Sequence, residues 1–384
     1  MTPLHLTGPE SSGGATAVAR HVQALVGGTF YAPSATPIQQ AWRTIAGMRS
    51  HKAEWEMVWE IRRQRPDLIH LHNFKAIGTA AIAAARRELV PVVWSCYDLW
   101  PLCPRDNLYT PDGPCDGQRS CLACYRPKGG HWPRVANLAL LGRRWRILRW
   151  INRLDGVIAL SEHSRQLLRR HGVQVPIHVV PPPVVVPNLA LEAHGMWTAS
   201  RCIADHAPRL VWAGWLAPNK GIEVFLQACA EGRAVLPAMQ CVAFGLVADP
   251  AYAARVALRA DLVGVHLVAD LPAAAMPHEA LLREVARADV LVCTEQWSNP
   301  YPVIVAEAVA LGVPVVASRI GGIPELLPAE CLATPTDPKA FAVRILAGLR
   351  DGFPDPPRLW TTKEIKAGIA HAYEAAERNH GRRK

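Results

Sequence analysis

Residues 294–327 combine a carboxylate on an expected helix, Glu307, with backbone positions suited to binding an anion. A helix is expected to begin at Val303, because Pro302 supplies the fixed φ of a first turn and loses no needed N–H there. The free amides of that turn can bind an anion such as a phosphate. Glu307 lies in the same short helix, and its carboxylate can accept hydrogen bonds from two vicinal hydroxyls. The segment therefore predicts a site for a ligand with a phosphate and a ribose-like diol.

Three other turns can present amides or positive charge to an anion. The pair 321–322 is Gly-Gly and precedes an expected helix that starts near Pro324. Lys220 opens another expected helix, where its ammonium acts as a point charge. Gly13 and Gly14 lie in a loop between an expected strand and helix. A Gly-Gly pair alone is weak evidence, since surface loops often contain one.

The elements that position these residues alternate along the chain, with short apolar runs separated by longer amphipathic ones. This alternation is typical of α/β units with parallel sheets. Strands are expected at 3–7, 67–72, 90–95, 156–160 and 177–180 in the first half, and at 209–214, 240–245, 264–268, 289–294 and 313–318 in the second.

The 384 residues suggest about two domains, and half of them are hydrophobic, which excludes a disordered or collagen-like chain. The formal charge of +10 favours anionic partners, namely nucleotide phosphates, an acidic membrane surface or nucleic acid. No secretory signal is visible and no apolar run is long enough to cross a bilayer, so a cytoplasmic protein is expected.

The ordered match within 294–327 resembles the donor-binding signature of retaining glycosyltransferase family four, a group with the GT-B fold. Glu307 and Ala308, then 312–315 (Gly-Val-Pro-Val), then 321–325 (Gly-Gly-Ile-Pro-Glu) fit that signature in order. Asn299 occupies the place of its first glutamate. The resemblance implies two Rossmann-like, doubly wound parallel-sheet domains facing across a cleft. It also implies transfer of a sugar from a nucleotide-sugar to an acceptor hydroxyl with retention of configuration, without a metal or other cofactor.

On this resemblance the chain divides into four parts. Residues 1–186 form an acceptor-side domain with a cysteine-rich insert at 96–130. Residues 187–208 are a linker, and 209–360 form the nucleotide-sugar-binding domain. Residues 361–384 are a helix that crosses back to the first domain.

The resemblance also implies a set of site residues. The positions near the transferred sugar are Asp98, Tyr97 and Asn299, and those that bind the donor are Gly13, Gly14, Lys220, Tyr301, Val303 and Glu307. Tyr97 replaces the usual histidine and can donate a hydrogen bond, or it can be an ordinary packed aromatic. Trp215 stands where an arginine is common. These departures leave an alternative, a catalytically weakened protein that binds nucleotide-sugar or a partner glycosyltransferase.

Within the insert, residues 103–124 carry four cysteines, Cys103, Cys115, Cys121 and Cys124, and the last two form a Cys-x-x-Cys pair. Four thiolates suit a structural zinc site, and reduced thiols or a redox pair are the other interpretations.

The segment 132–155 reads as an amphipathic helix with arginines on one side and tryptophans at its flanks. Such a face can dock on anionic lipid headgroups, or its apolar side can pack on the first domain. No nucleic-acid-binding module accompanies it, so no nucleic acid partner is expected. The expected partners are a nucleotide-sugar and a glycan or glycolipid acceptor of polysaccharide or glycolipid synthesis, with peripheral contact at the inner face of the plasma membrane.

Overall fold

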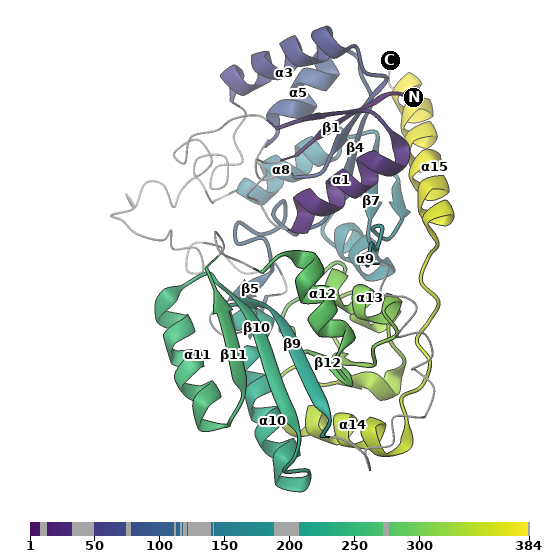
Figure 1. Ribbon diagram of the computed structural model, residues 1–384. Coiled ribbons are helices and arrows are strands. Elements are labelled where there is room, and N and C mark those ends of the chain that lie inside the picture. The colour runs from purple at the N-terminus through teal and green to yellow at the C-terminus, as the bar shows by residue number, and fades with distance from the viewer. Residues whose placement is uncertain are drawn as a thin grey trace. The chain divides into compact units, whose positions relative to one another are not determined.

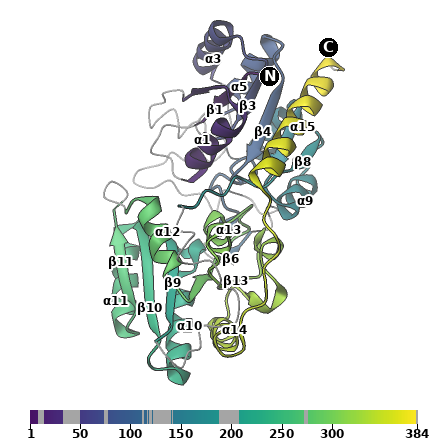
Figure 2. The ribbon, with the colours of Figure 1, turned by 45° about the vertical axis from the view of Figure 1, so that its right-hand side comes forward.

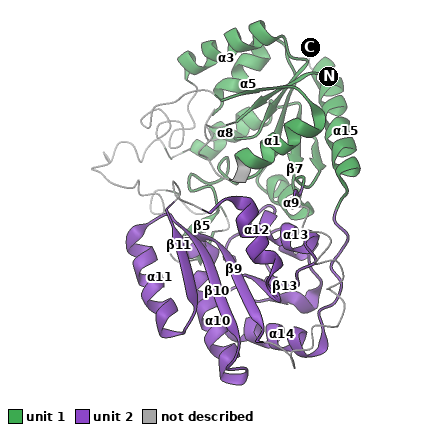
Figure 3. Cartoon of the chain, viewed as in Figure 1, with its two compact units in different colours: residues 1–183, 360–384 green, residues 184–359 purple. Residues whose placement is uncertain are grey.

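A computed structural model describes residues 1–7, 14–32, 50–73, 78–110, 113–115, 117, 121, 140, 142–187, 207–271 and 276–382. The chain divides into two compact units, shown in different colours in Figure 3. Unit 1 comprises Met1–Pro183 with Trp360–Lys384, and unit 2 comprises Val184–Leu359.

Unit 1 is built on a six-stranded parallel sheet in the order β2-β1-β3-β4-β7-β8 (Figure 1). The strands are β1 (Pro3–Leu6), β2 (Thr29–Tyr31), β3 (Leu68–Leu71), β4 (Val92–Cys96), β7 (Gly156–Ala159) and β8 (Ile177–Val179). Residues of β1, β3, β4 and β7 are buried throughout, as expected for parallel strands covered on both faces. The sequence pattern gave no indication of β2, which is short and half-exposed.

The helices of unit 1 are α1 (Gly14–Val26), α3 (His51–Gln64), α5 (Ala80–Arg87), α8 (Arg143–Ile151), α9 (Glu162–Arg170) and α15 (Thr362–Gly381). Ser161 caps α9 by accepting a hydrogen bond from the amide of Ser164, as its type and position predict. The C-terminal helix α15 packs against β4, β7, β8 and α1. Its His380 contacts the buried Asp155 carboxylate, with Nδ1 3.2 Å from Oδ2. Figure 2 shows this helix lying beside β4 and β8.

Unit 2 has a second six-stranded parallel sheet, in the order β11-β10-β9-β12-β13-β14. Its strands are β9 (Arg209–Leu216), β10 (Gln240–Val247), β11 (His266–Asp270), β12 (Val290–Cys293), β13 (Val315–Ser318) and β14 (Leu332–Ala333). Its helices are α10 (Ile222–Val235), α11 (Pro250–Leu262), α12 (His278–Ala286), α13 (Val303–Ala310) and α14 (Pro338–Asp351), with 3₁₀ turns η1 (Pro218–Lys220), η3 (Ile323–Glu325) and η4 (Ala329–Cys331).

The core of unit 2 places the sheet against α10, α11 and α14, with Trp212, Phe225 and Phe341 almost completely buried. Helix α13 begins and ends within a residue of the positions that the sequence predicts. Its end is marked by Gly312, two residues beyond the last helical residue, which takes a positive φ of 72°. The prediction of a helix that starts near Pro324 is wrong. Only the three-residue 3₁₀ turn Ile323–Glu325 forms there, and so short a turn has no helix dipole to offer an anion.

A two-stranded hairpin, β5 (Tyr109–Thr110) with β6 (Gly113–Pro114), lies in the cysteine-rich insert. Among the residues that the structure describes, no helix is long and apolar enough to cross a bilayer.

Candidate functional site

The first part of the site lies at the carboxyl ends of β9 and β12, two neighbouring parallel strands of unit 2. The turn after β9 approaches the end of β12 so closely that only glycine fits at Gly221. This residue has a φ of +69°, and an added Cβ would lie 1.8 Å from the carbonyl oxygen of Thr294. The amide of Gln296 also donates to the carbonyl of Asn219 at 2.9 Å. Carboxyl ends of parallel strands are the usual ligand-binding edge of open α/β sheets.

Lys220 projects from this turn onto a carboxylate that the sequence analysis missed. Its Nζ lies 2.5 Å from Oε1 of Glu295, and 5.2 Å from the ring centroid of Trp297. Asn299 donates from Nδ2 to the same Glu295 oxygen at 3.0 Å. Glu295 is 5% exposed, and its buried Oε2 atom has no hydrogen-bond partner among the residues that the structure describes. Lys220, Glu295 and Asn299 therefore form one compact polar cluster, here called the Glu295 cluster.

The loop between β12 and α13 is fixed by hydrogen bonds on both sides of Asn299. Its Oδ1 atom accepts from the amide of Tyr301 at 3.1 Å, and its carbonyl accepts from the amide of Gly322 at 2.9 Å. Gly321 has a φ of +61°, and a Cβ there would lie 2.5 Å from the carbonyl oxygen of Asn299. The Gly-Gly turn thus supports this loop. Burial raises the pKa of the Tyr301 phenol, so this hydroxyl keeps its proton at neutral pH.

Val303 is the first residue of α13, and Glu307 lies one turn further along that helix. Glu307 is 4% exposed, and its Oε1 atom lies 2.7 Å from Nε2 of His278 at the start of α12. The hydrogen bond from His278 to this carboxylate raises the pKa of the imidazole. Glu307 therefore pairs with a histidine, whereas Lys220, Asn299 and Tyr301 are linked through the Glu295 cluster. Nothing in the sequence pattern pointed to His278, which is 29 residues from its partner.

In unit 1 the predicted site residues lie at the amino end of α1 and just beyond β4. Gly14 is the first residue of α1, and Gly13 lies outside the described residues. Asp98 shapes the turn after β4, because its Oδ1 atom accepts from the amide of Trp100 at 2.9 Å. The Tyr97 hydroxyl lies 3.1 Å from Nδ1 of His72, and the two rings stack with their planes 11° apart. Burial raises the pKa of the Tyr97 phenol, so it is a neutral hydroxyl.

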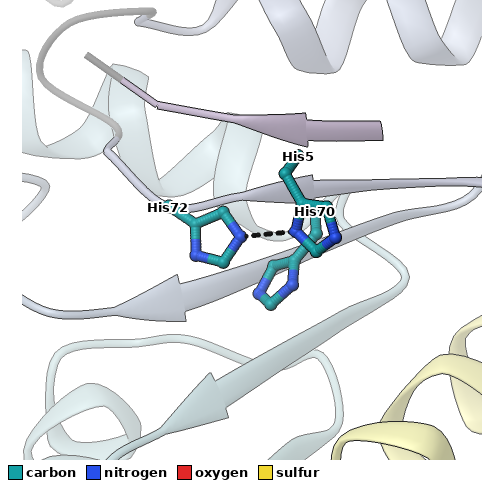
Figure 4. Close-up of side chains that lie close together, drawn as sticks. All are labelled: His5, His70 and His72. Atoms are coloured by element: carbon teal, nitrogen blue, oxygen red, sulfur yellow. Dashed lines mark hydrogen bonds between the residues drawn. The ribbon is translucent and has the colours of Figure 1, made fainter. Parts of the chain in front are cut away.

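Three buried histidines lie behind Tyr97, one on β1 and two on and after β3 (Figure 4). His5 Nδ1 lies 2.9 Å from His72 Nε2, and the second ring nitrogen of His5 lies 2.9 Å from the carbonyl oxygen of Gly27. His70 contacts two hydroxyls, Ser95 Oγ and Tyr373 Oη, each at 2.8 Å. Burial lowers the pKa of all three imidazoles. One nitrogen from each ring falls within 4.8 Å of the others, the only such grouping of three metal-ligating side chains among the described residues.

Of the four cysteines of the predicted zinc site, the three that the structure describes are free thiols and do not form such a group. Cys103 is buried, and burial is the main cause that raises the pKa of its thiol. Cys115 and Cys121 are partly exposed. Cys124 lies outside the described residues, so the zinc site of the sequence analysis stays a prediction.

In the described part of segment 132–155, helix α8 packs its apolar side in unit 1 and exposes basic and aromatic side chains on the other side. Its Ile147 and Ile151 are buried, so the apolar side packs in unit 1. Trp145 is 65% exposed, and the guanidinium of Arg149 lies 5.6 Å from the centroid of its ring. A basic, aromatic surface therefore remains on the outer side of the helix.

The two six-stranded parallel α/β sheets, one in each unit, are the architecture of the GT-B fold. The crystal structure of HepE (Alr3699) from Anabaena in complex with UDP-glucose is similar with a TM-score of 0.62 and 16% identity, covering 99% of this chain and 95% of that one. A trehalose-6-phosphate synthase structure from E. coli with UDP-2-fluoro glucose matches with a TM-score of 0.61 and 11% identity, covering 99% and 96%. At these identities the similarity shows the fold.

The sequence itself matches two family descriptions, Glycosyltransferase Family 4 over residues 23–186 and Glycosyl transferases group 1 over residues 207–351. A D-inositol 3-phosphate glycosyltransferase of Segniliparus rotundus is 28% identical over 203 residues, which are 51% of this chain and 43% of that protein. The chain thus aligns with less than half the length of this curated relative. The chain belongs to glycosyltransferase family 4, whose members are retaining enzymes that use nucleotide-sugars.

Proposed function

We propose that the protein transfers a hexose from a uridine diphosphate sugar to the hydroxyl of a glycan or glycolipid, in polysaccharide or glycolipid synthesis. The observation that carries this proposal is the Glu295 cluster, which holds an ammonium beside a buried carboxylate and a neutral amide at the carboxyl ends of β9 and β12. That edge of the sheet is where a GT-B enzyme needs charge to stabilise a diphosphate leaving group.

Each donor-binding residue has a role that follows from its chemistry. When the donor binds, Lys220 exchanges its contact with Glu295 for the diphosphate, and the free amides at the start of α13, from Val303 onward, add to that charge. Glu307 accepts hydrogen bonds from the ribose diol in place of the one from His278. Tyr301 lines the loop that precedes α13. No metal is needed for these interactions.

The nucleotide and sugar are suggested by the related structures. HepE holds UDP-glucose, and the trehalose-6-phosphate synthase holds UDP-2-fluoro glucose. UDP-glucose is therefore the first donor to test. For the acceptor side, the outward face of α8, with Trp145 exposed beside Arg149, favours work at an anionic membrane surface. Binding to vesicles with and without anionic lipid would test this, and equal binding to both would count against it.

A second candidate is a catalytically weakened protein that retains nucleotide-sugar binding. The observation that favours it is the engagement of Asn299 at both ends of its amide, with Glu295 and with the backbone of Tyr301. A side chain already engaged in this way has less freedom to turn toward a sugar than an unengaged one.

A panel of UDP-, GDP- and ADP-sugars separates the two candidates. We expect donor hydrolysis and binding of the matching nucleoside diphosphate, both lost in Lys220→Ala. Lys339→Ala is the matched control, because Lys339 is an exposed lysine of α14. Binding without hydrolysis or transfer would favour the weakened protein. If no donor binds, the proposed function is wrong.

A further inference from the structure

The hydrogen bonds that join Tyr97, His72 and His5 all point the same way from donor to acceptor. The partner of His5 fixes that direction. The carbonyl of Gly27 can only accept, so the His5 nitrogen that faces it, Nε2, must carry the proton. In a neutral imidazole the other nitrogen is then an acceptor, and His5 Nδ1 must receive a proton from His72 Nε2, 2.9 Å away.

The same reasoning continues from His72 to Tyr97. With its proton on Nε2, a neutral His72 has an acceptor at Nδ1, so the Tyr97 hydroxyl must donate to it across 3.1 Å. The neutral state of both rings agrees with their burial, which lowers the pKa of each imidazole. Three successive contacts therefore run in one direction, from the phenol to the carbonyl of Gly27.

We propose that His72 and His5 are positioning residues that commit the proton of the Tyr97 hydroxyl to the protein interior, so that this oxygen can meet a sugar only as a hydrogen-bond acceptor. Ser95 also hydrogen-bonds this hydroxyl, and its contact uses one of the two lone pairs of the oxygen. Tyr97 follows β4 directly, at the ligand-binding edge of the sheet of unit 1. The preferred partner is accordingly a sugar hydroxyl that donates. The sequence left two interpretations of Tyr97, a donor and an ordinary packed aromatic, and an acceptor role replaces the first of them. This role toward a sugar rests on the proposed function.

The alternative occupant of the cluster is a metal ion, and the hydrogen bonds disfavour it. A metal would need one nitrogen from each of His5, His70 and His72. Both ring nitrogens of every one of these histidines already have a partner, and those of His70 are two hydroxyls (Figure 4 shows the three rings). Binding would break several of these bonds, and no carboxylate belongs to the group.

The first test needs no activity. Long-range ¹H–¹⁵N NMR of the full chain labelled at histidine reports the tautomer of each ring, with assignment by His5→Gln and His72→Gln. We expect His5 and His72 as neutral Nε2–H forms near pH 7. A proton on Nδ1 of either ring, an imidazolium, or a tightly bound metal ion that both His5→Gln and His72→Gln lose would overturn the inference. If the wild-type chain turns over no donor, the proposed function fails while these tautomers still decide the direction of the contacts.

The second test distinguishes a role of His72 in positioning Tyr97 from a role only in folding. Glutamine at position 72 can accept from Tyr97 and donate to His5, whereas leucine can do neither. We expect His72→Leu to lower kcat/KM for the donor by roughly three- to ten-fold, as does Tyr97→Phe, and His72→Gln to recover most of the loss. His51→Gln is the matched control, because the His51 side chain is 80% exposed. An active wild type with unchanged kcat/KM in His72→Leu would refute the positioning role.

Discussion

Replacing Glu295 by glutamine removes the charge that neutralises Lys220 while it keeps a side chain of similar shape. In the structure the ammonium and carboxylate are 2.5 Å apart, with the lysine side chain 21% and the glutamate side chain 6% exposed. At an effective dielectric constant near 20 their attraction is about 7 kcal/mol before the cost of desolvation. Removing one member of a buried pair costs about 3–5 kcal/mol. Because the lysine is partly hydrated and glutamine still accepts a hydrogen bond, we expect a loss of about 1–3 kcal/mol in unfolding free energy.

The same substitution is expected to strengthen nucleotide binding although it lowers the free energy of unfolding. In the wild type, a diphosphate must displace Glu295 from Lys220 and then tolerate a carboxylate nearby. Without that carboxylate the binding free energy improves by about 1 kcal/mol, or roughly five-fold in Kd, for a charge several ångströms away in a partly hydrated site. Lower stability combined with tighter binding of UDP is the expected signature.

Denaturant unfolding and titration calorimetry with UDP measure the two effects. Glu279→Gln is the control, since its side chain is 62% exposed and pairs with Arg283 on the surface of α12. The gain in affinity should shrink as salt is raised, because the repulsion it relieves is screened. Weaker UDP binding by a folded Glu295→Gln variant would refute the reasoning and show that the carboxylate holds Lys220 in its binding orientation.

Three further predictions concern the His278–Glu307 pair, the turn at Gly221 and the cysteines of the insert. The pKa of His278 is raised by Glu307 above its unfolded value of 6.5, so the stability this pair adds is complete below that pH and is lost as pH rises through the folded pKa. His278→Gln should therefore cost roughly 0.2–1 kcal/mol at pH 6 and less at pH 9 by thermal unfolding, and a cost independent of pH would contradict this. Gly221→Ala should lower the free energy of unfolding by more than about 3 kcal/mol, because its Cβ meets backbone, whereas Gly142→Ala, with a similar φ of +67° but only the end of an arginine side chain nearby, should cost about 1 kcal/mol in denaturant unfolding. Metal analysis of protein purified without chelator tests the four-cysteine zinc site predicted for the insert 96–130: about one zinc per chain is expected if it forms, and reduced thiols without stoichiometric zinc would count against it.

The sequence predicts those features that depend on residues close together along the chain. The run that follows Pro302 places α13 within a residue, and Gly312 marks its end. Both sheets follow from the alternation of apolar and amphipathic runs, and the family resemblance supplied their pairing into a GT-B protein. Local rules failed where an element is short, as at β2 and at the 3₁₀ turn Ile323–Glu325.

The side-chain pairs of the site could not be predicted in the same way, because each joins residues from different elements. Glu295 meets Lys220 across 75 residues, and His5 meets His72 across 67. The only available signal for Glu295 was its place directly after the apolar run of β12, four residues before Asn299. Which carboxylate reaches the lysine depends on the approach of two strand ends, and that approach is set by the turn at Gly221.

Asn299, the residue that departs from the family signature, is explained by its neighbour. Its amide lies 3.0 Å from Glu295 Oε1, so a glutamate at position 299 would place a second carboxylate against the first. Two such charges about 4 Å apart repel by about 4 kcal/mol at an effective dielectric constant near 20, unless one takes up a proton. We therefore expect Asn299→Glu to lose about 2–4 kcal/mol of unfolding free energy, and the double variant Glu295→Gln with Asn299→Glu to recover most of it. The glutamine then supplies the neutral amide that position 299 has given up. Denaturant unfolding of the four proteins in this cycle measures the coupling between the two positions. Losses that simply add in the double variant would show that Asn299 and Glu295 do not compensate for each other.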